Sequence, residues 1–411
     1  VLKKLLRKIL PAPAETFHRR MDAMERLIKK QFDLLQKKAT KDEELTFQAR
    51  DSAALRQAEN DLSGRVREHL DRLSALEEQI SARSILWANE YERKTVCANW
   101  EPIEKGPEFA QRYQNLIRGL DANSIQIIVR ILARHERYLA TEEKTINLFS
   151  QKEQQMIRAL NENFYPEIIQ LSDELYAYQH YLLPIDYFEP GIFYYRLGLD
   201  GLRTLGKVSG KAIIDVGAYI GDTALVLSEL PACSIYCFEA VPENYSLMQT
   251  TIRLNHLDRV VAENLALGAD SGTLKIRVDG PCSTSVSQTI GGEAREVEVP
   301  LTTLDAYVAQ HNLEIGLIKV DIEGGEPDFL IGAKQTICRQ RPILLISIYH
   351  NTHDFFELKP MIESWNLGYT FHIHKPVFRN ATSEVLLCAE CTSEEENELK
   401  QHHTSLLAGT T

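Results

Sequence analysis

Hydrophobic positions in the first half of the chain recur every three or four residues, which is the spacing of helices. Residues 14–101 contain no proline and a single glycine, Gly64, and charged residues and glutamines fill the positions between the apolar ones. This pattern is typical of long helices that pair along a narrow seam. It predicts an oligomerising coiled coil or helical hairpin; a long helix folded back on its own chain would show the same pattern.

The first thirteen residues form a separate pattern. Four apolar residues share one helical face and four basic residues the other, before two prolines end the helix: Leu2, Leu5, Leu6 and Ile9, then Lys3, Lys4, Arg7 and Lys8, then Pro11 and Pro13. Such a basic amphipathic helix can dock on an anionic membrane surface or pack on protein. The sequence leaves both interpretations open.

Residues 102–190 continue the helical spacing and end in an aromatic linker. Apolar residues are dense from Ser124 to Leu132, and tyrosines and phenylalanines gather between Tyr176 and Tyr195. We expect most of these rings to pack between the helices and the following domain. Tyr194 and Tyr195 are also candidates for a substrate wall, because a tyrosine offers a flat apolar face with a polar tip, which suits sugars.

From Gly206 the pattern changes to short continuous apolar runs that alternate with helical segments. Parallel strands buried on both faces have this appearance, and the alternation predicts a doubly wound α/β sheet. The last two strands are expected to form an antiparallel pair. The predicted strands are 212–214, 234–238, 260–264, 273–278, 297–301, 317–320, 343–348, 369–373 and 385–387. We delimit this domain at 191–391 and expect 392–411 to be a polar tail.

The composition of the chain disfavours several classes of function. The formal net charge of −12 argues against general nucleic-acid binding, which needs a basic surface. The seven cysteines are odd in number and scattered, so we expect free thiols, including Cys388 and Cys391. Free thiols indicate a reducing compartment, so we also expect a cytoplasmic protein. No apolar run has the length of a membrane span, and the basic start does not resemble a secretory signal.

The first strand of this domain leads into a glycine turn. Asp215 ends the apolar run, Gly217 and Gly221 bracket the turn, and a helical pattern begins at once. A dinucleotide fingerprint would need a glycine where Tyr219 stands, so a close pyrophosphate is disfavoured. Asp-x-Gly-x-x-x-Gly instead resembles the first motif of S-adenosylmethionine-dependent methyltransferases. Glu239, at the end of the second strand, has the place of an acidic residue that binds ribose hydroxyls.

An ordered set of motifs makes the resemblance specific. Asp215–Asp222, Phe238-Glu239, Leu304-Asp305, Lys319–Glu326 and Ser347–His350 together resemble the FkbM family of S-adenosylmethionine-dependent methyltransferases. The resemblance covers roughly residues 190–390 and implies a Rossmann-like class I methyltransferase domain, preceded here by an α-helical region. It implies O-methylation, often on a sugar or glycan-like compound. The second strand has Phe-Glu-Ala where the family usually has Phe-Glu-Pro.

By position, the resemblance also implies which residues hold the cofactor, S-adenosylmethionine. Asp215, Gly217, Ala218 and Gly221 would hold its methionine part, and Glu239 its ribose. The remaining residues that we expect around it are Tyr219, Asp222, Thr223, Ala240, Asn264, Leu265 and Asp321.

The fourth and fifth strands deliver the candidate catalytic groups. We expect His350 to be the general base, because its ordinary pKa of about 6.5 suits neutral pH, and Asp321 to orient the cofactor or the histidine. Glu323 and Tyr349 are candidate substrate contacts. A divalent metal on Asp321, Glu323, Glu326 and His350 is a variant of this hypothesis; capping of the following helix is the alternative role for the carboxylates, above all Glu326.

The sequence therefore predicts a cytoplasmic O-methyltransferase that acts on a sugar, glycan or glycan-like hydroxyl. We expect a homo-oligomer joined through the N-terminal helices, possible peripheral contact with the inner face of the membrane through residues 1–10, and no nucleic-acid partner. The alternatives are a non-catalytic oligomeric scaffold with a methyltransferase-like fold, and a nucleotide-sugar or NAD-dependent enzyme on the same sheet.

Overall fold

The computed structural model describes residues 92–102, 106–140, 147–278, 284–285 and 295–391. All of them fall in one compact unit that comprises residues 89–411. The expected basic helix at 1–13, nearly all of the long helices at 14–101 and the polar tail at 392–411 lie outside the described residues. None of the helices in the described ranges is both long enough and apolar enough to span a membrane.

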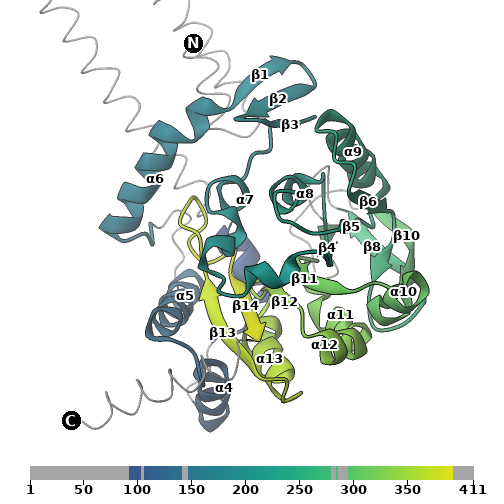
Figure 1. Cartoon of the computed structure of the whole chain (residues 1–411). Helices are drawn as coiled ribbons and strands as arrows, with labels where there is room; N and C mark the ends of the chain where they lie inside the picture. Colours follow the sequence, from purple (N-terminus) through teal and green to yellow (C-terminus); the bar gives the residue numbers. More distant parts are fainter. Residues whose placement is uncertain (1–91, 103–105, 141–146, 279–283, 286–294, 392–411) are drawn as a thin grey trace, which may run out of the picture. The chain divides into compact units, whose positions relative to one another are not determined.

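A seven-stranded sheet forms the centre of this unit, in the order β13-β14-β12-β11-β4-β5-β6 (Figure 1). The order reverses between β4 and β11, which creates a topological switch point. β14 is antiparallel to both of its neighbours and the other pairings are parallel, so the doubly wound sheet with an antiparallel last strand is confirmed. Its strands are β4 (Ala212–Val216), β5 (Ser234–Phe238), β6 (Val260–Glu263), β11 (Ile315–Val320), β12 (Ile343–Ser347), β13 (Tyr369–His374) and β14 (Leu386–Cys391).

The middle of the sheet is the core. Every residue of β4, β11 and β12 is buried, and burial of an aliphatic side chain stabilises the fold by about 1.5–3 kcal/mol. Helices connect the strands, as the alternating pattern predicts: α8 (Asp222–Leu227), α9 (Pro242–Leu254), α10 (Leu304–His311), α11 (Glu326–Gly332), α12 (Lys334–Gln340) and α13 (Thr352–Glu363). Cys388 and Cys391 in β14 are free thiols, as expected.

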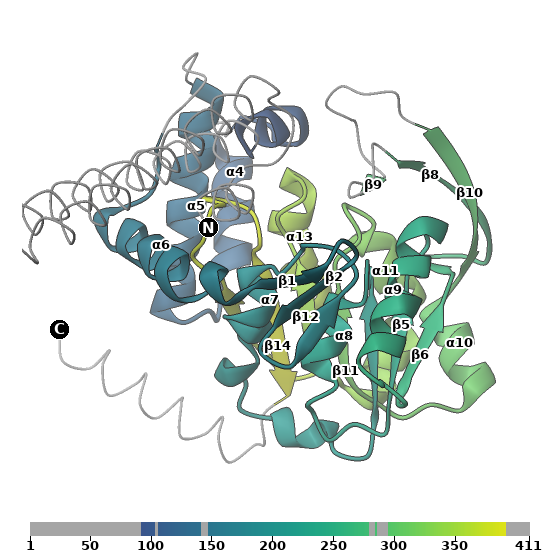
Figure 2. The same ribbon diagram turned by 90° about the horizontal axis from the view of Figure 1, so that it is seen from above.

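A second sheet of four strands stands apart from the large one, in the order β7-β10-β8-β9 (Figure 2). It comprises β7 (Ala266–Leu267), β8 (Gly272–Val278), β9 (Thr284–Ser285) and β10 (Arg295–Thr302). The prediction that β8 and β10 extend the main sheet is therefore wrong. They pair with each other and bury a small apolar core of their own, which includes Ile276 and Val299.

Helices from the N-terminal side cover the opposite edge of the large sheet. After a helical stretch at 92–99 come α4 (Pro107–Ile117), α5 (Ala122–Ala140) and α6 (Gln151–Asn163). α4 packs on α13 and α5 packs on β13. Ser124 Oγ accepts a hydrogen bond of 2.9 Å from the Ile373 N–H, so α5 satisfies part of the edge that β13 would otherwise leave unpaired.

The aromatic linker contains three short strands as well as short helices. After the short 3-10 helix η1 (Tyr165–Glu167) it forms an antiparallel sheet of three strands, β1 (Ile169–Ser172), β2 (Leu175–Tyr178) and β3 (Tyr181–Leu183), followed by α7 (Pro190–Phe193), η2 (Arg196–Gly201) and η3 (Leu205–Val208). Aromatic residues favour strands, but these strands are too short for alternation to reveal them. Most of the rings pack together, as expected. The ring centroids of Phe164 and Tyr178, for example, lie 4.7 Å apart.

Candidate active site

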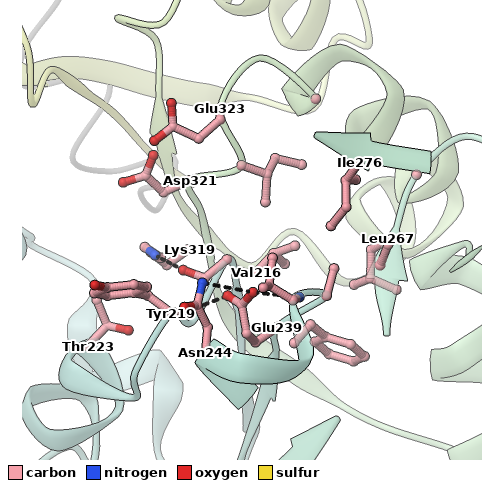
Figure 3. A pocket seen from close by; sticks show the side chains of 18 of the residues that line it. Val216, Tyr219, Thr223, Glu239, Asn244, Leu267, Ile276, Lys319, Asp321 and Glu323 are labelled. Carbon is pink, nitrogen blue, oxygen red and sulfur yellow. Dashed lines mark hydrogen bonds between the residues drawn. The ribbon is translucent and has the colours of Figure 1, made fainter. Parts of the chain in front are cut away.

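A cavity of about 400 Å³ opens at the switch point, beside the carboxyl ends of β4, β5, β11 and β12. Figure 3 shows polar side chains from these strands on one side of the cavity and apolar ones, including Leu267 and Ile276 of the second sheet, on the other. Ligands of doubly wound sheets bind in this crevice. The fold therefore places the candidate site where the sequence motifs converge.

The glycine turn after β4 packs directly on the end of β11. Gly217 has a φ of +76°, and a Cβ atom on it would lie 1.9 Å from the carbonyl oxygen of Asp321. Tyr219, in the same turn, has a φ of +47° although it is not a glycine. Only glycine fits at position 217, because any side chain would clash with Asp321. The backbone of Gly217 therefore forms part of the cavity wall.

Glu239 lies at the base of the cavity and fixes this turn. Its carboxylate accepts hydrogen bonds from the backbone N–H groups of Tyr219 (2.9 Å) and Val241 (2.8 Å). Burial raises the pKa of Glu239 to about 7, although these hydrogen bonds oppose the shift. Glu239, which was predicted to bind the ribose, thus lines the cavity and lies close to the glycine turn.

A buried ion pair supports the turn. Lys319 Nζ lies 3.3 Å from Asp215 Oδ1 and donates a hydrogen bond of 2.9 Å to the Gly217 carbonyl. Burial lowers the pKa of Lys319, but the carboxylates of Asp215, Asp321 and Asp222 outweigh this effect and raise it above its ordinary value. Lys319 therefore stays charged. The sequence reasoning missed it, although a lysine within an apolar strand is itself a signal.

Asp321, His350 and Glu326 form a row of alternating charges at the ends of β11 and β12. His350 Nε2 lies 3.1 Å from Asp321 Oδ1, and His350 Nδ1 lies 3.1 Å from Glu326 Oε1. Glu326 is fully buried and also accepts hydrogen bonds from the backbone N–H groups of Ile322 and Gly324. Glu326 therefore holds the loop after β11. This role resembles the capping of the following helix, which was the alternative prediction for this residue.

This environment corrects the expectation for His350. Burial lowers its pKa, but the charges of Glu326 and Glu323 and the contact with Asp321 raise it well above the ordinary value. The His350 side chain is 4% exposed, and His350 is not among the residues that line the cavity. A buried imidazolium between two carboxylates has no free nitrogen with which to accept a proton, so the premise of an ordinary pKa near 6.5 is wrong.

The same contacts determine whether the predicted metal ligands can meet at one ion. Donor atoms of Asp321, Glu326 and His350 lie within 4.8 Å of one another. Three of the four predicted ligands therefore place one donor atom each within reach of a single metal ion. Binding would require the imidazole to release its proton, and both Glu326 oxygens also accept backbone hydrogen bonds. Glu323, the fourth predicted ligand, is half-exposed and is not part of this group.

Several predicted residues lie behind the cavity wall rather than in it. Asp215, Ala218, Gly221 and Asn264 are not among the lining residues. Asp215 is fully buried and accepts a hydrogen bond from the Thr223 hydroxyl, and Asn264 donates to the carbonyls of Glu239 and Ala240. The predicted residues that do line it are Gly217, Tyr219, Asp222, Thr223, Glu239, Ala240, Leu265, Asp321, Glu323 and Tyr349.

The two tyrosines chosen as a substrate wall are not in the cavity. Tyr194 is 48% exposed, and the Tyr195 hydroxyl donates to the carbonyl of Val377. Both follow α7, whose short turn directs them away, whereas Tyr187 precedes α7 and lines the cavity. The structure adds further lining residues that the sequence reasoning missed, namely Glu189, Asn244, Lys319, His374 and Glu384.

Comparisons with known proteins agree with this architecture. The model of the methyltransferase FkbM domain matches residues 215–374. "Methyltransferase 1" of Beauveria bassiana (strain ARSEF 2860) is 25% identical over 235 residues, which cover 51% of this chain and 92% of that protein.

Solved structures show weaker similarity. The methyltransferase FkbM from Methylobacillus flagellatus KT is 20% identical, with a TM-score of 0.44, over 69% of this chain and 59% of that one. M. jannaschii TYW2 in complex with AdoMet is 12% identical, with a TM-score of 0.28, over 54% of this chain and 86% of that one. The match of the domain model shows that the C-terminal half of the chain contains a methyltransferase FkbM domain, at residues 215–374.

Proposed function

We propose that this protein is an S-adenosylmethionine-dependent O-methyltransferase that acts on a hydroxyl of a sugar, glycan or glycan-like acceptor. The observation that carries the proposal is the cavity at the switch point, which has Glu239 at its base and the Asp321 carboxylate at its other side (Figure 3). A methyltransferase of this family uses S-adenosylmethionine, and a cavity of about 400 Å³ is within the range of small-molecule sites.

The lining residues fit this cofactor. Glu239 carries acceptor oxygens for ribose hydroxyls, and Leu265, Leu267 and Ile276 provide apolar surface for an adenine ring. The turn from Gly217 to Tyr219 presents backbone to the methionine part. When bound, the cofactor supplies an electrophilic methyl group, so the protein's main task is to orient a hydroxyl toward it.

Asp321 is the carboxylate that we assign to the acceptor hydroxyl. Burial raises its pKa, but the contact with His350 and the charges of His350 and Lys319 lower it below the ordinary value, so it is ionised at neutral pH. Its side chain is 27% exposed and lines the cavity. Asp321 would accept the hydroxyl's hydrogen bond and take up its proton, while His350 acts as a positioning residue that keeps Asp321 charged and oriented.

Calorimetry with S-adenosylhomocysteine and with NAD tests the proposed cofactor. We expect the wild-type protein and the surface control Glu298→Gln to bind S-adenosylhomocysteine and not NAD. Binding of NAD would favour a dehydrogenase on the same sheet, and binding of neither compound would favour a scaffold; both results would contradict the proposal. Glycans from cells with and without the protein should then differ by the mass of methyl groups that replace hydroxyl hydrogens.

We also propose that the protein is a homo-oligomer and that residues 1–10 contact an anionic membrane surface. The support is the sequence pattern of residues 1–101 alone. Sedimentation with and without residues 14–100 tests the oligomer, and binding to anionic vesicles with and without residues 1–13 tests the membrane contact. Unchanged behaviour of the truncated proteins would contradict these two proposals.

A further inference from the structure

Two tyrosines that line the cavity pack against each other at a steep angle. The ring centroids of Tyr187 and Tyr219 lie 5.2 Å apart, and the ring planes meet at 71°. Tyr187 precedes α7 and lies before the matched domain, whereas Tyr219 belongs to the glycine turn after β4. In such an edge-to-face pair, the ring that presents its edge uses neither of its faces on its partner. Tyr187 and Tyr219 therefore form an aromatic corner in the cavity wall.

Neither residue of the aromatic corner is buried in the core. Tyr187 is 37% exposed, and Tyr219 is half-buried although one part of it packs against the central core. Both residues line the cavity. They therefore keep surface that a ligand in the cavity can contact.

Tyr219 has a backbone conformation that disfavours a large side chain. Its φ of +47° lies in the left-handed region, which bulky residues rarely adopt. Glycine would relieve this strain, and strained residues cluster at functional sites. The ring is thus present at this position in spite of the backbone, which points to a use for the ring itself.

The backbone of Tyr219 is fixed to Glu239, the proposed ribose ligand, by a hydrogen bond of 2.9 Å from its N–H group. Figure 3 shows Tyr219 on the opposite side of Glu239 from Leu267 and Ile276, the apolar surface proposed for the adenine. In S-adenosylmethionine the sulfur is bonded to the exocyclic carbon of the ribose, away from the adenine. A cofactor with its ribose at Glu239 would therefore direct its sulfonium group toward the ring of Tyr219.

The charges around the cavity are compatible with a cation at this place. Among the residues described as lining the cavity, Lys319 is the only lysine or arginine, and its ammonium group lies 3.3 Å from Asp215. Burial lowers the pKa of the lining residue His374 to about 4, so it is neutral at pH 7. His350 lies between two carboxylates and outside the lining residues. Acidic residues line the cavity as well, among them Asp222, Glu239, Asp321 and Glu323.

We propose that the aromatic corner of Tyr187 and Tyr219 recognises the sulfonium cation of S-adenosylmethionine and thereby distinguishes this cofactor from its neutral product, S-adenosylhomocysteine. This inference rests on the proposed function. The face of an aromatic ring attracts a cation through the ring quadrupole, whereas a thioether carries no charge. The aromatic corner therefore favours exchange of the product for another molecule of the cofactor.

Calorimetry with S-adenosylmethionine and with S-adenosylhomocysteine tests this recognition without a known acceptor. We expect the wild-type protein to bind S-adenosylmethionine at least about tenfold more tightly than the product. Tyr219→Leu and Tyr187→Leu should each reduce this ratio of affinities at least about threefold, because the contact between cation and ring is lost. Tyr219→Phe and Tyr187→Phe keep the ring and should keep the ratio within about twofold of wild type. A wild-type ratio near one would overturn the proposal.

The ratio also separates recognition from a purely structural role. If the rings only supported the turn, both leucine variants would weaken the two ligands equally, and this result would overturn the proposal. Tyr187 lies outside the turn, so Tyr187→Leu gives the answer if Tyr219→Leu does not fold. The surface control Glu298→Gln should match wild type with both ligands. Binding of neither ligand by the wild-type protein would refute the proposed function, whereas equal binding of both would refute the aromatic corner alone.

Nuclear magnetic resonance gives a direct readout of the contact. S-adenosylmethionine with an isotope label in its methyl group is the probe. We expect its methyl proton signal to move upfield on binding to the wild-type protein, because the ring current of a tyrosine shields a group above the ring face. The shift should persist in Tyr219→Phe and shrink in Tyr219→Leu. A methyl signal that is unshifted or moves downfield in the wild-type complex would overturn the proposal.

Discussion

Two buried cations, Lys319 and His350, determine the charge state of the carboxylates at the cavity. Lys319 neutralises Asp215 and holds the Gly217 carbonyl, and His350 keeps Asp321 ionised although burial opposes it. Both cations are almost fully buried. Because breaking a buried ion pair leaves an uncompensated charge, substitution of either cation should affect both stability and the site.

Glu239→Gln tests the ribose contact and its dependence on pH. The pKa of Glu239 is raised from 4.5 to about 7, so in the folded protein it binds a proton that the unfolded chain releases at lower pH. Its contribution to stability therefore falls as pH rises through that window, while affinity for S-adenosylhomocysteine rises as the carboxylate ionises.

We expect wild-type affinity for S-adenosylhomocysteine to fall severalfold between pH 8 and pH 6. In Glu239→Gln it should be at least about tenfold weaker at pH 8, with little of this pH dependence. Calorimetry across the pH range measures both effects. Equal affinity and an equal pH profile in the variant would remove Glu239 from the binding site.

His350→Gln tests whether this histidine positions Asp321. The variant leaves Asp321 and Glu326 without the cation between them, so we expect a loss of about 3–5 kcal/mol in the free energy of unfolding. The pKa of Asp321 should rise at the same time. Urea unfolding measures the first effect and carbon-detected NMR the second; an unchanged Asp321 pKa in a folded variant would contradict the assigned role.

At the scale of elements, the site depends on close contact between the turn after β4 and the end of β11. Paired registers place Asp215 beside Lys319 and Val216 beside Val320, so Gly217 meets the backbone of Asp321. The same two strands flank the point where the strand order reverses. A change in the turn should therefore disturb both the proposed cofactor side and the proposed acceptor side of the cavity.

Gly217→Ala should abolish S-adenosylhomocysteine binding, because its Cβ would lie 1.9 Å from the Asp321 carbonyl oxygen in a backbone with φ of +76°. Relief of this clash requires the turn or β11 to move. Gly206→Ala is the matched control, since its Cβ would have no atom within 4 Å and its φ is not positive. Wild-type affinity in folded Gly217→Ala would contradict the proposed packing.

At the scale of the whole molecule, segments far apart in the sequence complete the cavity. Glu92 holds residues 381–383, and Arg134 donates to the carbonyl of Ala381. Trp100 Nε1 donates to the carbonyl of Tyr349, which lines the cavity. The helices before the FkbM domain are therefore part of the structure that supports the wall of the cavity at Tyr349 and Glu384.

Glu92→Gln tests this support. The carboxylate is 3% exposed and also accepts hydrogen bonds from the hydroxyls of Tyr138, Thr382 and Ser383. Because an amide cannot accept all of these bonds, we expect a loss of at least about 2 kcal/mol in the free energy of unfolding. S-adenosylhomocysteine affinity should stay within about threefold. A stability equal to that of Glu298→Gln would contradict the anchoring role.

Features that depend on residues close together in the sequence were predictable. Continuous apolar runs identified the central strands, because a parallel strand buried on both faces needs them. The glycine turn and the acidic residue after the second strand indicated a nucleotide-type site, because their spacing reflects local backbone geometry. The short strands β1–β3 and the separate sheet of β7–β10 were missed, since both depend on pairing rather than on a local period.

The sequence by itself thus determined the class of fold, the position of the glycine turn and the resemblance to the FkbM methyltransferase domain. Only the tertiary structure decided that His350 is buried between two carboxylates and that Asp215 supports the cavity from behind. Protonation depends on burial and on charges that lie close in space but far apart in the chain. No local pattern encodes those distances, so the chemical roles at the site emerge only when the strands and flanking segments come together.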